Sequence, residues 1–102
     1  MLVDHTIDFL PLDKAEEMLS RLTRLVKKGG KFVVTGTDIY EVSKAFANYH
    51  IDIADVNRHV FGNSKRLAFS AVTMSNLLQH NLQMKIIKKR VNEFIYTIEA
   101  QR

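Results

Sequence analysis

The 102-residue sequence contains no cysteine and no long apolar run, and each absence excludes a class of protein. Without cysteine there is no disulfide framework and no metal site built on thiolates, so we expect a cytoplasmic protein. No stretch approaches the roughly 18 apolar residues of a membrane-spanning helix. Residues 1–3 lead directly into polar positions, so no signal peptide is predicted.

Size and composition predict one globular domain over residues 1–102. The hydrophobic fraction is 46% and the charged fraction 25%, as in ordinary soluble proteins. A chain of this length builds a single core but not two. The three widely spaced histidines His50, His59 and His80 do not have the spacing of metal ligands, so no metal site is predicted.

Positive charge is concentrated in the second part of the chain. Residues 1–60 carry a net charge of −1 and residues 61–102 a net charge of +5. A basic region of this kind fits an anionic partner such as nucleic acid, although a solvated surface explains the same charges. No aromatic residues are interleaved with the cations to stack on bases. The candidate phosphate contacts are Lys65, Arg66, Lys85, Lys88, Lys89 and Arg90.

The clearest periodic segment is a helix that begins near Asp13 and ends before a glycine pair. Asp13 and Glu16 have the spacing of a capping box, and Gly29 and Gly30 predict a left-handed C-terminal cap. One apolar stripe with helical spacing comprises Ala15, Met18, Leu19, Leu22, Leu25 and Val26.

A short strand or strand end is predicted over residues 2–10, before Pro11, and a second strand over 32–34. Because 32–34 is a continuous apolar run, we expect that strand to be covered on both faces. The polar residues after it lie at a strand's carboxyl end, where open α/β sheets bind ligands. They predict a substrate pocket, although helix capping alone also explains Asp38. The pocket candidates are Thr35, Thr37, Asp38 and Tyr40.

The rest of the chain predicts three helices and a hairpin. The helices cover 39–49, 52–60 and 73–80, and the strands 84–91 and 94–100 join at a turn of Asn92 and Glu93. Asn81 is the predicted left-handed cap of the last helix. The inward positions are Val42, Ala45, Phe46 and Tyr49 in the first helix, Met74, Leu77 and Leu78 in the third, and Phe94, Tyr96, Ile98 and Ala100 in the last strand.

Two stretches resemble class I S-adenosylmethionine-dependent methyltransferases. The residues D-H-T-I-D-F-L-P at 4–11 are similar to the end of that family's fourth strand, which often reads S-H-V-L-E-H-I-P. The residues L-V-K-K-G-G-K-F at 25–32 are similar to the L-K-P-G-G-K-L segment before the fifth strand, with Lys28 in place of proline.

Four later segments follow in the family's order. Asp38 lies where the family often has P-D, and Phe61-Gly62 lies where a Y-G pair is common. Residues 77–82 resemble the helix before the sixth strand, with Asn81-Leu82 in place of Gly-Phe, and the closing hairpin resembles the sixth and seventh strands. The style is closest to small phage and bacterial members of the methyltransferase type 11 group, which implies a bacterial or phage-infected cell.

The resemblance implies an α/β fold equivalent to the C-terminal half of a Rossmann-like methyltransferase sheet, with a parallel strand pair and a terminal antiparallel hairpin. The family holds its cofactor with a glycine-rich turn and a ribose-binding acid, and residues 1–102 contain neither. We therefore expect S-adenosylmethionine to bind only if another chain supplies the missing half, and we expect no autonomous activity.

The resemblance also places His5 and Asp8 where the family's fourth strand reaches cofactor and substrate. Either residue would orient or deprotonate a methyl acceptor, although a structural histidine and a local cap are the simpler alternatives.

A sheet cut at this point has an open edge and uncovered faces, so we expect a homo-oligomer or a partner chain that completes the sheet. Three functions remain open: a methyltransferase half-domain, a non-catalytic oligomerisation or interaction module, and a basic protein associated with nucleic acid.

Overall fold

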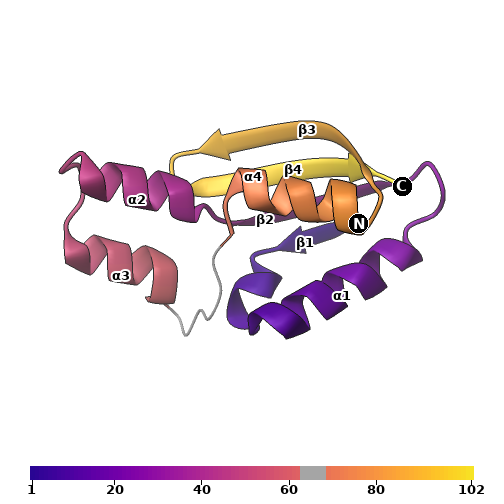
Figure 1. The fold of residues 1–102 in the computed structure, drawn as a ribbon, viewed down its shortest axis with the longest axis horizontal. Helices are drawn as coiled ribbons and strands as arrows, with labels where there is room; N and C mark the ends of the chain where they lie inside the picture. The colour runs from indigo at the N-terminus through magenta and orange to yellow at the C-terminus, as the bar shows by residue number, and fades with distance from the viewer. Residues whose placement is uncertain (63–68) are drawn as a thin grey trace.

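The structure is a computed structural model that describes residues 1–62 and 69–102. It has an α/β fold built on a four-stranded sheet of order β1-β2-β4-β3 (Figure 1). Strand β1 is parallel to β2, while β4 is antiparallel to both β2 and β3. The predicted parallel pair and terminal antiparallel hairpin are confirmed. In chain order the elements are β1 (Leu2–Asp4), the 3-10 helix η1 (Thr6–Phe9), α1 (Leu12–Leu25), β2 (Lys31–Thr37), α2 (Ile39–Ala47), α3 (Ile53–Phe61), α4 (Ala71–Asn76), the π-helical turn η3 (Leu77–Asn81), β3 (Lys85–Asn92) and β4 (Ile95–Gln101).

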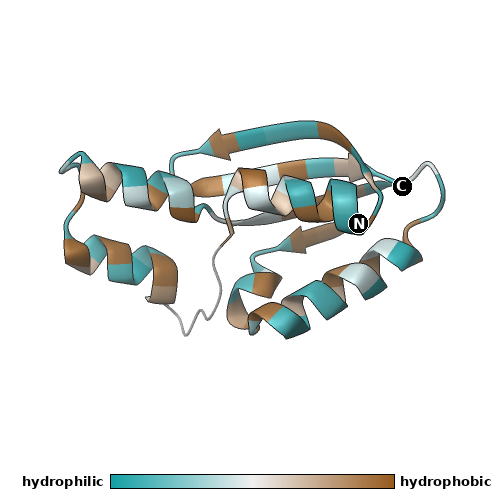
Figure 2. Ribbon diagram, viewed as in Figure 1, coloured by the Kyte–Doolittle hydropathy of each residue, from teal (hydrophilic) through white to brown (hydrophobic). Residues whose placement is uncertain are grey.

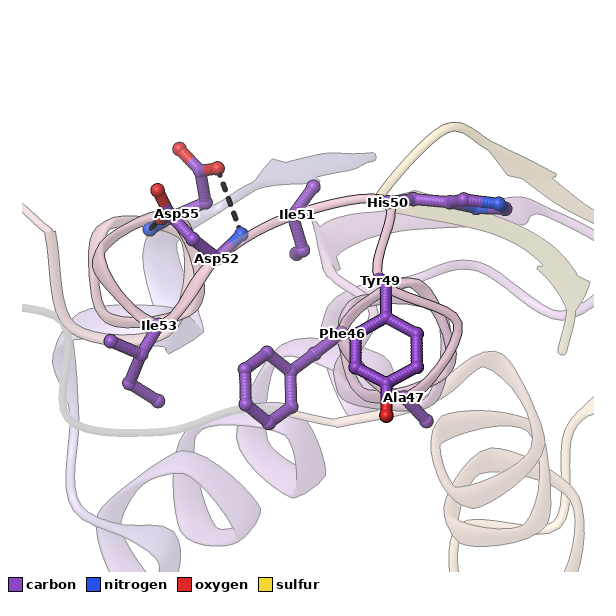
Figure 3. Close-up of a pocket in the computed structure, with 8 residues that line it drawn as sticks. All are labelled: Phe46, Ala47, Tyr49, His50, Ile51, Asp52, Ile53 and Asp55. Carbon is purple, nitrogen blue, oxygen red and sulfur yellow. Dashed lines mark hydrogen bonds between the residues drawn. The ribbon is translucent and has the colours of Figure 1, made fainter.

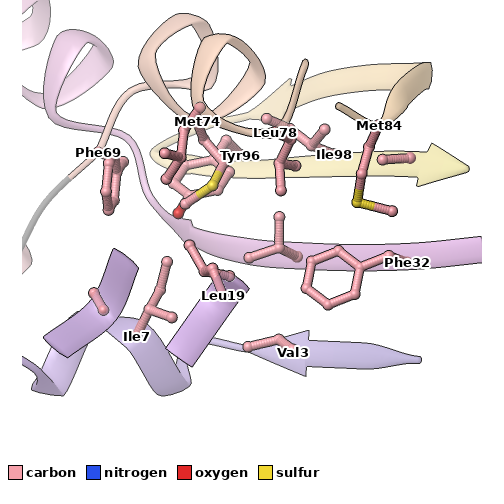
Figure 4. Close-up of a cluster of buried hydrophobic side chains, with 14 of the residues drawn as sticks. Val3, Ile7, Leu19, Phe32, Phe69, Met74, Leu78, Met84, Tyr96 and Ile98 are labelled. Atoms are coloured by element: carbon pink, nitrogen blue, oxygen red, sulfur yellow. The ribbon is translucent and has the colours of Figure 1, made fainter. Parts of the chain in front are cut away.

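The core lies between one face of the sheet and the helices α1 and α4 (Figure 4). Phe32 and Ile98 from the sheet, and Leu19 from α1, are fully buried. Tyr96, Ile98 and Ala100 of β4 point into this core, as predicted, because successive side chains of a strand point to opposite faces. Phe94, which was predicted to join them, lies in the turn before β4 and is only half-buried. Each large apolar side chain buried in this way contributes about 1.5–3 kcal/mol to folding.

The opposite face of the sheet lies away from α1 and α4, and it is polar. Val33 and Thr97 stay partly exposed on it, whereas Phe32 and Val34 on the core face are fully buried. The prediction that residues 32–34 are covered on both faces is therefore wrong. We call this surface the uncovered face. The strand register assigns to it Leu2, Asp4, Lys31, Val33, Thr35, Thr37, Lys85, Lys88, Arg90, Asn92, Ile95, Thr97, Glu99 and Gln101.

Helix α1 is confirmed, but its ends differ from the prediction. Pro11 is the N-cap and no side chain caps the helix, so the capping box of Asp13 and Glu16 is wrong. The helix ends at Leu25, and Gly29 (φ +83°) forms the following turn instead of the cap. Carbonyl groups at this end of the helix have no partner within the helix. Those of Arg24 and Val26 accept hydrogen bonds from the Arg102 guanidinium, at 2.6 and 2.7 Å.

The remaining helices and the hairpin are confirmed to within a few residues, although the hairpin turn comprises Glu93 and Phe94 instead of Asn92 and Glu93. Met74, Leu77 and Leu78 are buried as predicted. The left-handed position after the last helix is Gln83 (φ +56°) instead of Asn81, because the chain continues through a π-helical turn before it reverses.

The helices α2 and α3 form a hairpin that projects past the end of the sheet (Figure 1). The molecule is accordingly elongated, with extents of 44 × 24 × 19 Å. Val42 and Ala45 are buried as predicted, but Phe46 is 43% exposed and Tyr49 is 95% exposed. The two aromatic positions are wrong because this part of α2 extends beyond the sheet that would have covered them. No residue of α3 is buried.

Candidate functional site

His5, Asp8 and Thr37 meet at the carboxyl ends of the parallel strands β1 and β2. The Nδ1 atom of His5 lies 3.3 Å from Oδ2 of Asp8, and the same oxygen accepts a hydrogen bond from the Thr37 amide at 3.3 Å. Asp8 is fully buried, while the His5 side chain is 30% exposed. A buried carboxylate is costly unless it is hydrogen-bonded, and these two donors offset that cost. The cluster therefore combines a fixed carboxylate with an imidazole that reaches the surface.

Local backbone geometry brings these residues together. His5 adopts a left-handed conformation (φ +58°) at the end of β1, and its amide donates to the Thr35 carbonyl at 3.0 Å. The chain then turns through η1, where the Asp8 amide donates to the His5 carbonyl at 3.1 Å. The reversal places Asp8 beside the last residues of β2.

A buried tyrosine, Tyr96, lies next to the cluster inside the core. Tyr96 on β4 is fully buried, and its hydroxyl has no hydrogen-bond partner among the described residues. Burial raises the pKa of Tyr96, and the charges of Asp8 and Asp38 raise it further, so the phenol stays neutral. Gly36 permits this packing, since a Cβ there would lie 2.6 Å from the Tyr96 hydroxyl and 3.0 Å from an Asp8 oxygen.

Gly36→Ala is expected to destabilise the protein by about 1–3 kcal/mol, because the methyl group would overlap the fully buried Tyr96 side chain. Urea unfolding of Gly36→Ala, Tyr96→Phe and the double variant measures the effect as a double-mutant cycle. Tyr96→Phe removes the nearest atom and should recover part of the loss. Purely additive effects would contradict the proposed overlap.

His5 and Thr37 also line a cavity of about 140 Å³. Its other walls include His59 of α3 and Ile95 of β4. The His59 ring packs against Phe94 with ring centroids 4.6 Å apart. The sequence did not point to His59 as a site residue, because only the fold brings α3 against the turn between β3 and β4. Two imidazoles thus line one small cavity.

Asp38 has a structural role in this arrangement. Its carboxylate accepts hydrogen bonds from the amides of Glu41 at 3.1 Å and Ala71 at 2.9 Å, so it caps α2 and fixes the start of α4. The alternative reading of Asp38 as a helix cap is confirmed.

The other two pocket candidates are separated. Thr35 donates to Asp4 on the uncovered face, while Tyr40 and Asp38 line a cavity of about 480 Å³ on the opposite side of the sheet. The structure therefore does not bring Thr35, Thr37, Asp38 and Tyr40 into one pocket.

The cationic residues of β3 predicted to contact phosphate lie on both sides of the sheet. Lys88 and Arg90 lie on the uncovered face, whereas Lys89 lines the cavity beside Tyr40. Figure 2 shows β3 as hydrophilic over most of its length. Lys65 and Arg66 lie outside the described residues.

A wider, open cavity of about 840 Å³ lies between α2 and α3 (Figure 3). Phe46 and Ile53 line it, and its two carboxylates, Asp52 and Asp55, are occupied in a reciprocal cap of α3. The cavity therefore offers an apolar surface without a free acid.

Residues 1–62 and 69–102 contain neither a metal-binding cluster nor a membrane-spanning helix. No group of three or more histidine, aspartate or glutamate side chains there is arranged to hold a metal ion. None of the helices in these ranges is long and apolar enough to cross a membrane.

Two solved methyltransferase structures share this fold. An O-methyltransferase family protein from Burkholderia thailandensis superimposes with a TM-score of 0.70 at 16% identity, over 99% of this chain and 29% of that one. An O-methyltransferase family 2 protein from Planctomyces limnophilus, in complex with apigenin, superimposes with a TM-score of 0.65 at 9% identity, over 99% of this chain and 30% of that one. No protein-family model matches the sequence, and a search of curated proteins finds no significant relative. The chain thus has a methyltransferase-like α/β fold and spans less than a third of the length of these neighbours.

Proposed function

We propose that this chain forms the acceptor side of a class I S-adenosylmethionine-dependent methyltransferase that methylates a hydroxyl oxygen. The observation that carries the proposal is the pairing of His5 with buried Asp8 at the carboxyl end of β1. In open α/β sheets this is the edge at which ligands bind. The likeness to O-methyltransferases supports the choice of oxygen as the acceptor atom.

The pair is suited to remove a proton from an acceptor. When Nδ1 of His5 carries hydrogen, it donates to Asp8 Oδ2, which fixes the ring and leaves Nε2 as the proton acceptor. Nε2 lies 3.7 Å from an oxygen of Asp4 at the same edge. An acceptor hydroxyl beside Nε2 would lose its proton to His5 as its oxygen is methylated.

The described residues do not by themselves fit the cofactor. The cavity beside His5 measures about 140 Å³, against roughly 300–1,000 Å³ for sites that hold a whole organic ligand. None of the four glycines belongs to a G-x-G-x-x-G turn. S-adenosylmethionine therefore requires binding residues outside these 102.

The edge of β1 is a suitable place for those residues to join. The Met1 carbonyl and the His5 amide bond to β2, so the alternate polar groups of Leu2 and Asp4 face away from the sheet. The Leu2 side chain is 64% exposed beside them. An unpaired edge of this kind pairs with another strand.

The same edge also favours a second candidate function, a non-catalytic oligomerisation module in which two copies pair through β1.

Calorimetry with S-adenosylmethionine, together with sedimentation in the same buffer, distinguishes the two functions. We expect no binding to this chain alone, and micromolar binding once it is co-expressed with a polypeptide that carries a glycine-rich cofactor-binding half of the same fold. Leu2→Lys should prevent that assembly by blocking the edge, while Leu12→Lys, at an apolar residue 52% exposed on α1, should not. A stable dimer that binds no cofactor with or without the second polypeptide would favour the oligomerisation module.

A further inference from the structure

The uncovered face has too few apolar side chains to serve as half of a core. In this register its apolar members are Leu2, Val33 and Ile95, and the other positions carry threonine, asparagine, glutamine or charged residues. A sheet face that receives a layer of helices is rich in valine, isoleucine and leucine. This face therefore fits a polar occupant better than an apolar one.

Its charge is positive and concentrated along β3. In the register of the sheet, Lys88 lies opposite Glu99 and Arg90 opposite Thr97, so both cations point to the same face. Glu99 is paired with Lys31 across the sheet at 3.1 Å. Within the described residues neither Lys88 nor Arg90 forms an ion pair.

A hollow of about 120 Å³ lies between these side chains. It is lined by Lys88 and Arg90 from β3, Thr97 and Glu99 from β4, and Val33 from β2. The hydroxyl of Thr97 and the two cations offer donors to one small space. Such a set matches a phosphate oxygen better than a neutral ligand.

We propose that the uncovered face binds the phosphodiester backbone of single-stranded nucleic acid, with Lys88 and Arg90 as the main phosphate contacts. Residues two apart on a strand are about 6.8 Å apart, so an extended backbone running along β3 meets them in turn. No aromatic residue lies on the uncovered face, so the contacts are electrostatic and independent of base sequence. The proposal does not depend on the proposed methyl transfer.

Fluorescence anisotropy with a labelled oligothymidine of about 16 nucleotides tests the proposal between about 50 and 200 mM salt. We expect the wild-type affinity to fall steeply as salt rises. The double variant Lys88→Gln, Arg90→Gln should bind about tenfold more weakly at low salt, with the slope of log K against log salt reduced by about 1.4. Glu99→Gln should strengthen binding, because it removes a negative charge from the hollow and releases Lys31.

The matched control is Lys27→Gln, Lys28→Gln, which removes the same charge from two exposed lysines in the turn between α1 and β2. It should bind like wild type, and circular dichroism verifies that every variant is folded. An equal loss in both double variants would mean that only net charge matters, and the proposal would fail. Tighter binding to polyglutamate than to oligothymidine would also overturn it, since the surface would then be one for acidic protein.

Discussion

Asp38→Ala is expected to lower the free energy of unfolding by about 2–5 kcal/mol, the largest stability effect we predict for a single polar side chain here. Loss of an N-cap costs about 1–2 kcal/mol, and leaving the buried Ala71 amide without an acceptor costs about 1–3 kcal/mol more. The side chain is only 2% exposed, so water does not replace it easily. Against a total of about 5–15 kcal/mol for a domain, the loss is severe.

Urea unfolding measures this effect, and Asp52→Ala is the matched control. Asp52 caps α3 through the Asp55 amide at 2.8 Å, but that cap is exposed and α3 buries no residue. We expect Asp52→Ala to lower the global stability by about 1 kcal/mol or less, the lower part of the range for an N-cap, because α3 buries no residue. Equal losses in the two variants would show that Asp38 acts only as an ordinary cap and does not connect α2 to α4.

His5→Asn is expected to slow methyl transfer by about 10²–10⁴-fold in the proposed assembly with S-adenosylmethionine, because it removes the proposed proton acceptor. Asparagine is chosen because it tolerates the left-handed backbone of residue 5 better than alanine does. The affinity for S-adenosylmethionine should stay unchanged, since the described residues do not form the cofactor site. Single-turnover rates and calorimetry separate the two quantities.

His80→Asn provides the control, since this exposed histidine lies on η3 and does not line the cavity beside His5. It should leave the rate unchanged. A variant His5→Asn with the wild-type rate, or one whose cofactor affinity falls as far as its rate, would exclude His5 as the base.

The fold was largely predictable because its signals are local. The alternation in residues 94–100 predicted which side chains of β4 are buried, and helical spacing located α1 and the buried positions of α4 and η3. The both-faces prediction for residues 32–34 failed because three consecutive apolar residues do not reveal their alternation. The polar character of the uncovered face becomes visible only when Lys31 and Thr35 are combined with the polar residues that the register places beside them on the neighbouring strands.

The site was predictable only in part, for the same reason. His5 and Asp8 lie three residues apart and form a pair within one turn, so both could be identified as site candidates from a short segment of sequence. Thr37 joins them from a strand 29 positions further along, and His59 from a projecting helix. Asp38 accepts hydrogen bonds from two helices, α2 and α4. The capping of α2 was visible in the sequence, but no sequence pattern indicated the contact with the Ala71 amide of α4.

The absence of buried residues in α3 has a consequence for how the protein opens. Undocking α3 exposes little new surface, so the free energy of this opening depends only weakly on denaturant. Its amides would therefore exchange with solvent through a local fluctuation, while β2 and β4 exchange only through global unfolding. Because His59 belongs to α3, each such fluctuation removes one wall of the His5 cavity and leaves the sheet intact.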